Sequence, residues 1–222
     1  MQVRRAIILA AGQGFQLDGV NKVLIRHPKS GKTILQHAVE AFEGFKITVV
    51  VGYRAIQIME EFPELDFVVN PDWALTSNAM SLGLALTDEP TYVVSGDIFF
   101  YRNLIQDLDK ADGNLVLTDN RENRSLTSVH CVLKRKNQIS ETYQGAVRDI
   151  RHPEAVGLFK ISNQSVLKGW KKTSILHGNL FVGQTLPTGI IPIKSHPLRG
   201  HFFDEINTSS DYLRLLNRDK VK

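Results

Sequence analysis

A short apolar run followed at once by a loop of small residues is the feature that most restricts how this chain can fold. The run Ala6–Leu9 is rich in β-branched residues and too short for a helix, which is typical of a strand buried on both faces. It ends in the loop Ala10-Ala11-Gly12-Gln13-Gly14, where glycine lets the backbone approach a ligand closely. Backbone N–H groups of such a loop, with Lys22 nearby as a point charge, are suited to bind a chain of phosphates. The pattern therefore predicts a nucleoside-triphosphate site.

The rest of the first half alternates between strand-like and helix-like segments. Such alternation predicts βαβ units, and hence a parallel sheet with helices on both faces. Thr33 is placed to cap the first of these helices. The expected strands are 46–51, 65–69 and 91–94, and the expected helices are 33–45, 54–62 and 78–86.

The second half changes to shorter strand-like runs, without a linker or an internal repeat. We therefore expect a single domain over 1–222, with a nucleotide-binding half at 1–118 and an acceptor-binding half at 119–222. The predicted fold class is α/β: a Rossmann-like, three-layer α/β/α arrangement around a central mixed, mostly parallel sheet. Further strands are expected at 114–118, 128–133, 138–142, 157–161 and 190–193, and helices at 166–171 and 209–216.

Several polar segments are predicted to meet at one edge of this sheet. Ligands of open α/β sheets bind outside the carboxyl ends of the strands, which places the Gly12 loop, Gly52, the segment 71–81 and Asp97 on the same rim. A carboxylate at the end of a strand, such as Asp97, is well placed to bind Mg²⁺ beside phosphate oxygens. The alternative for Asp97 is to cap a helix that begins near Tyr101.

Other polar residues have one functional and one structural interpretation each. Asn207 offers a second oxygen to the metal, or caps the last helix. Thr76, Ser77 and Asn78 offer hydrogen bonds to a base or ribose, or cap the helix that follows. Lys160 falls within a strand pattern, so an inward side chain would bind phosphate and an outward one would be surface. His152 and His201 are weaker candidates for acceptor contacts, whereas packing is favoured for His37 and Trp73.

Two familiar phosphate-binding motifs are excluded. The run Ser30-Gly31-Lys32-Thr33 resembles the end of a P-loop, but position 26, where that motif requires glycine, is Arg26. Gly12 and Gly14 do not begin a dinucleotide fingerprint, because position 17 is leucine and no acidic residue ends the second strand. The seven histidines and the single cysteine, Cys131, show neither metal-ligand spacing nor a nucleophile signature.

The composition limits partners and compartment. The formal charge of +4 comes from scattered basic residues, so we expect an anionic small-molecule substrate and no nucleic acid. One cysteine excludes an internal disulfide framework and fits a reducing compartment. Apolar runs fall short of the roughly 18 residues of a membrane span, and the chain starts directly with a strand. We expect a cytoplasmic protein without a membrane partner, and a homodimer is compatible with the sequence.

The segment Ala6–Gly14 with Lys22 resembles the signature of nucleotidyltransferases of the glycosyltransferase-A-like fold. The resemblance extends through 49–53, 70–82, Ser95-Gly96-Asp97, 157–160 and Glu205-Ile206-Asn207 with Asp211. Segments 70–82 and 157–160 are most similar to cytidylyltransferases that act on phosphocholine, aminoethylphosphonate and related small acceptors. The resemblance implies transfer of CMP from CTP to a small anionic acceptor, with Mg²⁺ as cofactor.

The same resemblance implies a role for each matching residue. Lys22 and Asp97 would be catalytic, Asp97 and Asn207 would hold Mg²⁺, and Lys160 and Glu205 would contact the acceptor. The implied nucleotide contacts are Leu9, Ala10, Ala11, Gly12, Gln13, Gly14, Lys22, Gly52, Thr76, Ser77, Asn78, Ser81 and Gly96.

One departure from the family pattern keeps alternatives open. The family usually has Ser or Thr and then Arg after the second glycine, whereas this chain has Phe15-Gln16 and so lacks a charge-assisted contact to the triphosphate. A catalytically weakened nucleotide-binding protein is therefore an alternative, as is a transferase that uses another nucleotide on a sugar phosphate or a molybdopterin. A glycosyltransferase is disfavoured, because Ser95 replaces the first Asp of the usual Asp-x-Asp metal motif.

Overall fold

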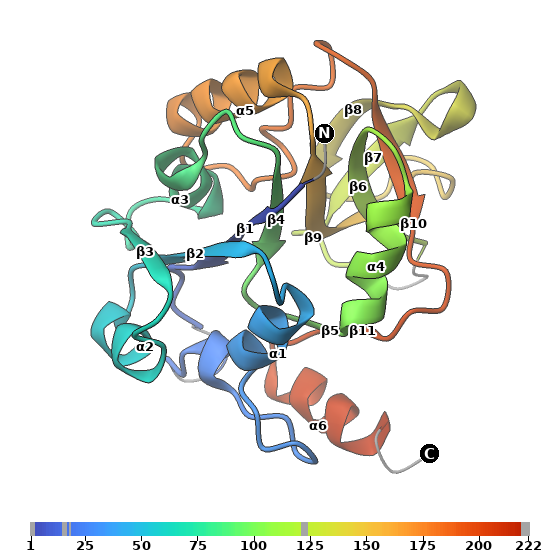
Figure 1. The fold of residues 1–222 in the computed structure, drawn as a ribbon. Coiled ribbons are helices and arrows are strands. Elements are labelled where there is room, and N and C mark those ends of the chain that lie inside the picture. The colour runs from blue at the N-terminus through green and yellow to red at the C-terminus, as the bar shows by residue number, and fades with distance from the viewer. Residues whose placement is uncertain (1–2, 15–16, 18, 121–123, 219–222) are drawn as a thin grey trace.

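A computed structural model describes residues 3–14, 17, 19–120 and 124–218. Within this part of the chain, nine strands form one twisted sheet, whose main path runs β10-β6-β9-β4-β1-β2-β3 (Figure 1). β7 and β8 form a hairpin beside β9. The strands of the sheet are β1 (Arg5–Ala10), β2 (Lys46–Val51), β3 (Asp66–Val69), β4 (Thr91–Ser95), β6 (Asn114–Asp119), β7 (Val129–Leu133), β8 (Ile139–Gln144), β9 (Glu154–Ile161) and β10 (Ile193–Pro197).

The sheet is mixed because one central strand is reversed. β3, β2, β1 and β4 are mutually parallel in the order expected of βαβ units, and β10 is parallel to β6. β9 is inserted between β4 and β6 and is antiparallel to both. The α/β prediction with a mostly parallel central sheet is therefore confirmed.

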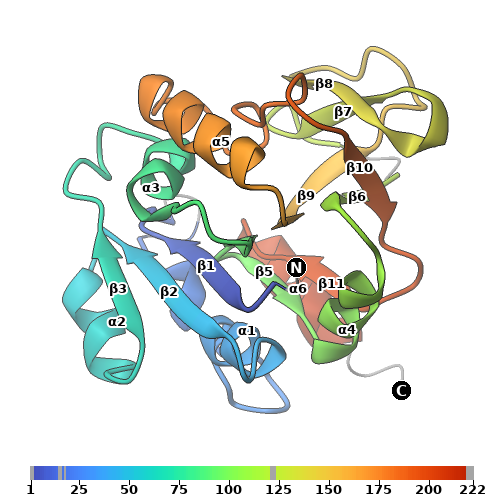
Figure 2. The same cartoon turned by 45° about the horizontal axis from the view of Figure 1, so that its top comes forward.

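Helices cover both faces of the sheet, and side chains of β1 point alternately into the two cores that result. Ile8 packs with α1 (Ile34–Ala41), α2 (Ala55–Glu61) and α4 (Arg102–Lys110) on one face. Ile7 and Leu9 pack with α3 (Asn78–Ala85) and α5 (Gln164–Leu176) on the other. The two views show this separation, with α3 and α5 side by side (Figure 2). Near-continuous apolar strands follow from burial on both faces.

A small ribbon outside the main sheet brings the end of the chain to the strand ends. β5 (Ile98–Phe100) pairs antiparallel with β11 (Phe203–Glu205), and α6 (Ser209–Arg218) follows β11. Phe99, Ile206 and Leu215 form a third small core with Ile34 of α1. The Ile206 N–H also donates to the Asp97 carbonyl oxygen at 2.9 Å, which holds the residues after β11 against the segment that follows β4.

The predicted elements agree with the structure where their own patterns are strong. Thr33 caps α1 in a capping box with Gln36, as its position predicts. The strand expected at 190–193 is wrong, since the strand is 193–197, and β5 and β11 were not among the predicted elements. A helix near Tyr101 was expected as the alternative for Asp97, and α4 begins there, but Tyr101 takes its capping position in place of Asp97. Among the described residues, no helix combines the length and apolar character needed to span a bilayer.

Candidate functional site

A large cleft opens at the carboxyl ends of β1 and β4, as the strand-end rule predicts. Its volume is about 1560 Å³, and residues from both halves of the chain line it. Of the residues implicated by the sequence, those that line the cleft are Leu9, Ala10, Gly12, Gln13, Lys22, Asn78, Gly96, Asp97, Glu205 and Asn207.

Two glycines shape the edge of this cleft. A Cβ atom on Gly96 would lie 2.6 Å from the carbonyl oxygen of Leu9, so only glycine lets β4 end this close to β1. The Gly96 N–H donates to the same oxygen at 2.9 Å, which fixes where Asp97 enters the cleft. Around Gly12, by contrast, no atom lies within 4 Å of an added Cβ, so its open side faces space that a ligand can fill.

Three polar side chains meet in the cleft from distant parts of the sequence. The Lys22 amine lies 3.3 Å from Asp97 Oδ2 and donates to Asn207 Oδ1 at 2.5 Å. Lys22 begins the single helical turn after the glycine loop, Asp97 follows β4 and Asn207 follows β11. The pairing of Lys22, Asp97 and Asn207 therefore gathers a cation and two oxygen ligands beside the glycine loop.

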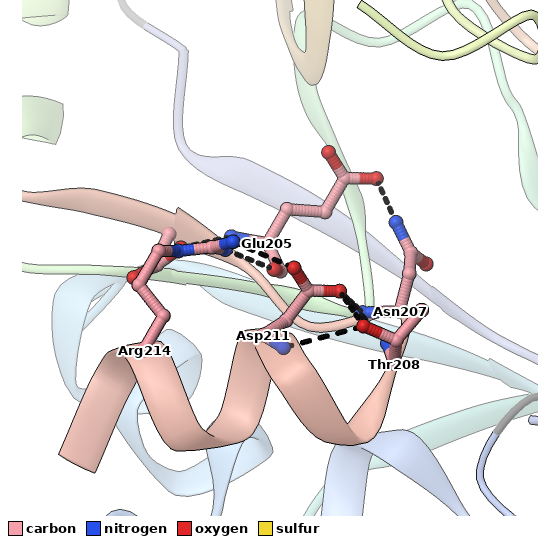
Figure 3. Close-up of polar contacts among 6 residues, drawn as sticks. Glu205, Asn207, Thr208, Asp211 and Arg214 are labelled. Carbon is pink, nitrogen blue, oxygen red and sulfur yellow. Dashed lines mark hydrogen bonds and ion pairs between the residues drawn. The ribbon is translucent and has the colours of Figure 1, made fainter. Parts of the chain in front are cut away.

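The orientation of Asn207 is set by its neighbours (Figure 3). Its Nδ2 group donates to Glu205 Oε1 at 2.7 Å, which leaves Oδ1 directed at Lys22. The Asp211 carboxylate accepts the backbone N–H groups of Asn207 and Thr208 at 3.0 and 2.8 Å, and also the Thr208 hydroxyl. Asn207 is therefore held by both its side chain and its backbone.

Asp211 stays ionised in this position. Burial alone would raise its pKa, but hydrogen bonds from the Thr208 hydroxyl, the Asn207 backbone and Arg214 outweigh burial and hold the pKa below its ordinary value. Arg214 also pairs with the buried carboxylate of Asp204 at 2.5 Å. Hydrogen bonds and ion pairs thus hold the cleft-lining residues of β11 and α6 in place.

Several sequence-predicted residues lie behind the cleft and do not line it. Asn70 Nδ2 donates to the hydroxyl oxygens of Thr76 and Ser81, which ties this segment together. Ser77 takes the helix-capping position of α3 without a side-chain cap bond, and its N–H donates to Gly178. Thr76, Ser77 and Ser81 are not among the residues that line the cleft, and their contacts to the nucleotide stay a prediction. Asn78 lines the cleft, yet its Oδ1 accepts the Val182 N–H at 2.9 Å.

Two small residues of the glycine loop, and Gly52 beside it, have packing roles. A Cβ on Gly52 would lie 2.6 Å from Trp73, and one on Gly14 would lie 2.7 Å from the Val20 carbonyl oxygen. Ala11 accepts the Tyr53 N–H through its carbonyl group. These residues shape the rim from outside the cleft, while Phe15 and Gln16 lie outside the described residues.

The expectation for Lys160 is corrected. Its side chain points inward, but at the end of β9 remote from the cleft, where Lys160 pairs with Tyr92 at the start of β4. The amine donates to the carbonyl oxygens of Leu108 and Ala111, each at 2.8 Å, at the C-terminal end of α4. Lys160 therefore satisfies helix-end carbonyls and does not contact an acceptor.

We expect Lys160→Met to lower stability without affecting substrate binding. Removal of the buried amine leaves carbonyl groups of α4 unsatisfied, at a cost of about 1–3 kcal/mol in the free energy of unfolding. Chemical denaturation checks this value, with Lys168→Met on the exposed side of α5 as control. An acceptor KM that rises tenfold at unchanged stability would restore the original role of Lys160.

Two cleft residues, Glu154 and Ser128, were not identified from the sequence. Glu154 and Ser128 line the acceptor half from β9 and the start of β7. His201 does line the cleft, beside Asp107, whereas His152 hydrogen-bonds to Tyr143 away from it. Glu154 had no local signal, because the strand was expected to begin three residues later, at 157.

Comparisons with known proteins identify the class. The profile of the MobA-like NTP transferase domain matches residues 6–175, so the chain belongs to this family. A CTP:phosphocholine cytidylyltransferase from Streptococcus pneumoniae (LicC) has a similar structure, with a TM-score of 0.78 at 19% identity over 98% of this chain and 99% of that one. The inositol-1-phosphate CTP transferase from T. maritima has a TM-score of 0.74 at 18% identity, over 100% and 98%. The fold is therefore that of glycosyltransferase-A-like nucleotidyltransferases.

Curated relatives match parts of the chain. The bifunctional protein GlmU of Methanococcus maripaludis is 31% identical over 53% of this chain, although the match spans only 31% of GlmU. A probable molybdenum cofactor guanylyltransferase from Methanosarcina acetivorans is 28% identical over 68% of this chain and 73% of that protein. The CMP-5'-(3-aminopropyl)phosphonate synthase of Streptomyces rubellomurinus is 30% identical over 48% of this chain and 19% of that protein. The protein is thus a nucleotidyltransferase by family.

Proposed function

We propose that this nucleotidyltransferase transfers CMP from CTP to a small phosphate or phosphonate monoester and releases pyrophosphate. The observation that carries the proposal is the meeting of Lys22, Asp97 and Asn207 beside the open face of Gly12. An oxygen of the acceptor attacks the α-phosphorus of the nucleotide as the bond to pyrophosphate breaks. The acceptor is already anionic, so the site needs positioning and charge neutralisation in place of a strong base.

Magnesium fits the donor set of this site. Asp97 and Asn207 each direct an oxygen at the same Lys22 amine, so both oxygens point towards one cationic position. Carboxylate and amide oxygens are the hard ligands that Mg²⁺ takes in proteins, alongside phosphate oxygens. When bound there, Mg²⁺ would neutralise charge on the triphosphate while Lys22 holds a phosphate oxygen.

The charge of the cleft also favours a metal-bound nucleotide. Six carboxylate residues line it, but Lys22 and Arg214 are the permanent cations among its described residues, and Arg214 is paired with Asp204 and Asp211. A free triphosphate would meet net negative charge there. We therefore expect turnover to require a divalent cation, and removal of Mg²⁺ with EDTA to abolish pyrophosphate release.

The choice of CTP is supported by what similar proteins are named for. The phosphonate synthase relative makes a CMP conjugate, and both solved structures described above are named as CTP-dependent transferases. The guanylyltransferase relative supports GTP as the competing nucleotide. A pyrophosphate-release assay with each of the four nucleotides and Mg²⁺ separates them. We expect CTP to be preferred, and a preference for GTP would overturn this part of the proposal.

A nucleotide-binding protein without turnover is the competing class, motivated by Phe15-Gln16 in place of the usual Arg. Calorimetric titration with CTP and Mg²⁺ distinguishes the two classes. Tight binding with no pyrophosphate release across phosphate and phosphonate acceptors would favour the binding protein. Release that depends on both CTP and an acceptor would favour the transferase.

Weakening the support of Asn207 should weaken the metal site selectively. Asp211→Asn removes the charge from the group that accepts the Asn207 and Thr208 N–H groups and the Thr208 hydroxyl, so the backbone of Asn207 is held less firmly. Partners behind a metal ligand commonly contribute 10–100-fold, and we expect the Mg²⁺ concentration for half-maximal rate to rise about 10-fold. Ser209→Ala, at the exposed start of α6, is the control. An unchanged Mg²⁺ dependence in Asp211→Asn would remove Asn207 from the metal site.

A further inference from the structure

The Lys22 amine occupies the position towards which both proposed metal ligands point. Its Nζ lies 3.3 Å from Asp97 Oδ2 and 2.5 Å from Asn207 Oδ1. A divalent cation bound to the same pair of oxygens would lie close to this amine. Two cations about 4 Å apart repel each other, and near a protein surface that repulsion is several times stronger than in bulk water. Lys22 therefore competes for the position in which a metal would bind.

Lys22 also neutralises Asp97 from within the chain. Among the described residues, the one ion pair of Asp97 is with Lys22, and the exposed fractions of the two side chains are 23% and 24%. Salt screens a partly buried pair of this kind less than a pair on the open surface. The carboxylate thus already has a cationic partner before any ligand binds.

Both oxygens are held by contacts other than those to the amine. Asn207 Nδ2 donates to Glu205 Oε1 at 2.7 Å, and the Asn207 N–H donates to Asp211 at 3.0 Å (Figure 3). The Ile206 N–H donates to the Asp97 carbonyl oxygen at 2.9 Å, which ties the backbones of the two proposed ligands together. Withdrawal of the amine would therefore leave a pair of oxygens that is still in place.

The Lys22 side chain can move its amine while its stem stays where it is. A Cβ on Gly14 would lie 3.1 Å from Lys22 Cγ and 3.7 Å from Lys22 Cε, so the stem runs along the glycine loop. The end of a lysine side chain is flexible, and its ammonium group binds phosphate as a point charge. A triphosphate at the open face of Gly12 would offer oxygens to this amine. Rotation near the end of the stem then exchanges the oxygens of the protein for those of phosphate.

The pair of oxygens is by itself a weak metal site. Among the described residues there is no group of three or more His, Cys, Asp or Glu side chains that could hold a metal ion. Mg²⁺ is commonly bound through one or two carboxylates together with the phosphates of a substrate. A nucleotide would therefore act twice on this site, since it supplies further oxygens and removes the competing amine.

We propose that Lys22 excludes divalent cations from Asp97 and Asn207 until a nucleotide draws its amine away, so that the site opens to a metal when a triphosphate is bound. This inference rests on the transferase function proposed above and concerns the regulation of its metal site. Asp97 keeps a cationic partner throughout, first the amine and then the metal. Lys22 thus controls access to the metal position in addition to its contact with phosphate.

The experiment measures metal binding without turnover. Mn²⁺ is the probe, because electron paramagnetic resonance follows its free concentration, and Mg²⁺ is then added as a competitor. The proteins are the wild type, Lys22→Met, Lys22→Gln and the control Lys46→Met, which removes an exposed lysine paired with Asp66. A double variant, Lys22→Met with Asp97→Asn, tests whether a gained site uses Asp97. Thermal unfolding checks that each variant retains its fold.

Without a nucleotide, we expect Lys22→Met and Lys22→Gln to bind Mn²⁺ about 10-fold more tightly than the wild type, within the range usual for coupling between two sites. Lys46→Met should match the wild type, and the double variant should lose the gain. Saturating α,β-methylene CTP, corrected for Mn²⁺ held by the free analogue, should strengthen Mn²⁺ binding more in the wild type than in Lys22→Met. The reason is that the wild type alone has an amine to displace.

The outcomes separate this inference from the transferase proposal. Unchanged Mn²⁺ affinity in both Lys22 variants, or a gain that persists in the double variant, would overturn the exclusion and leave CMP transfer to be judged by pyrophosphate release. Equal strengthening by the analogue in the wild type and Lys22→Met would overturn the role of the nucleotide in it. A gain that needs Asp97, without pyrophosphate release on any nucleotide, would support the exclusion and overturn the transferase.

Discussion

Replacement of Asp97 by alanine is expected to lower kcat for pyrophosphate release by about 10²–10³-fold, the scale for loss of one preorganised electrostatic contact. The Asp97 carboxylate contacts the Lys22 amine at 3.3 Å and is the charged member of the proposed metal ligands. Without it, the cleft retains Asn207 as a neutral ligand and loses the group that fixes Lys22. The rate at saturating CTP, acceptor and Mg²⁺ is the measurement.

The control for Asp97→Ala is Asp66→Ala, which removes a carboxylate from an exposed ion pair with Lys46. Exposed pairs contribute little to stability, so this variant should keep wild-type activity. Thermal unfolding should show that Asp97→Ala retains its fold, since Asp97 lies in the cleft and outside the hydrophobic cores. Full Mg²⁺-dependent release by Asp97→Ala would show that the metal is held elsewhere.

Removal of the Lys22 charge should have an effect of similar size. Lys22→Met keeps much of the side-chain volume but removes a positive charge. Among the described residues that line the cleft, the other permanent cation is Arg214, which is already paired with Asp204. Charge that develops on the leaving pyrophosphate would then be poorly neutralised, and we expect kcat to fall by about 10²–10³-fold. Lys22→Arg should recover only part of the rate, because a planar guanidinium does not replace a compact ammonium between two oxygens.

The matched control for Lys22→Met is Lys46→Met, the other member of the exposed pair with Asp66. Lys22 and Asp97 contact each other, so the double variant should lose less than the product of the two single losses. Steady-state kinetics of all four proteins measures this coupling. Wild-type kcat in Lys22→Met would contradict a role for Lys22 in turnover. Losses that multiply fully in the double variant would mean that the two residues act independently.

Elements with a strong local pattern were predictable from the sequence. β1, β2 and β4 are apolar runs buried on both faces, and Thr33 with Gln36 forms a capping box that short-range spacing predicts. Asp97 lies at a strand end beside the glycine loop, where the rule for open sheets places it. Asn207 could be named as a candidate ligand because it is a capping-type residue near the last helix, and such a residue also offers an oxygen.

Elements whose position depends on distant partners were not predictable. β10 carries the polar sequence Ile193-Lys-Ser-His-Pro197 and pairs only with β6 in the main sheet path, so the more apolar run at 190–193 was the wrong signal. The inward direction of Lys160 was foreseen, but the group it meets is a set of α4 carbonyls that only the tertiary fold brings there. The hydrogen bonds that Thr76 and Ser81 accept from Asn70 likewise depend on the tertiary fold.

The pairing of β5 with β11 determines when, during synthesis of the chain, the polar residues of the cleft can come together. Lys22 and Asn207 are 185 positions apart, and their contact requires β11 to have paired with β5. Contacts between such distant positions form late, because a long loop must close before they can stabilise anything. A partly synthesised chain that already contains the glycine loop and Asp97 therefore still lacks a complete centre. The transferase activity proposed for this site therefore requires that translation has passed Asn207.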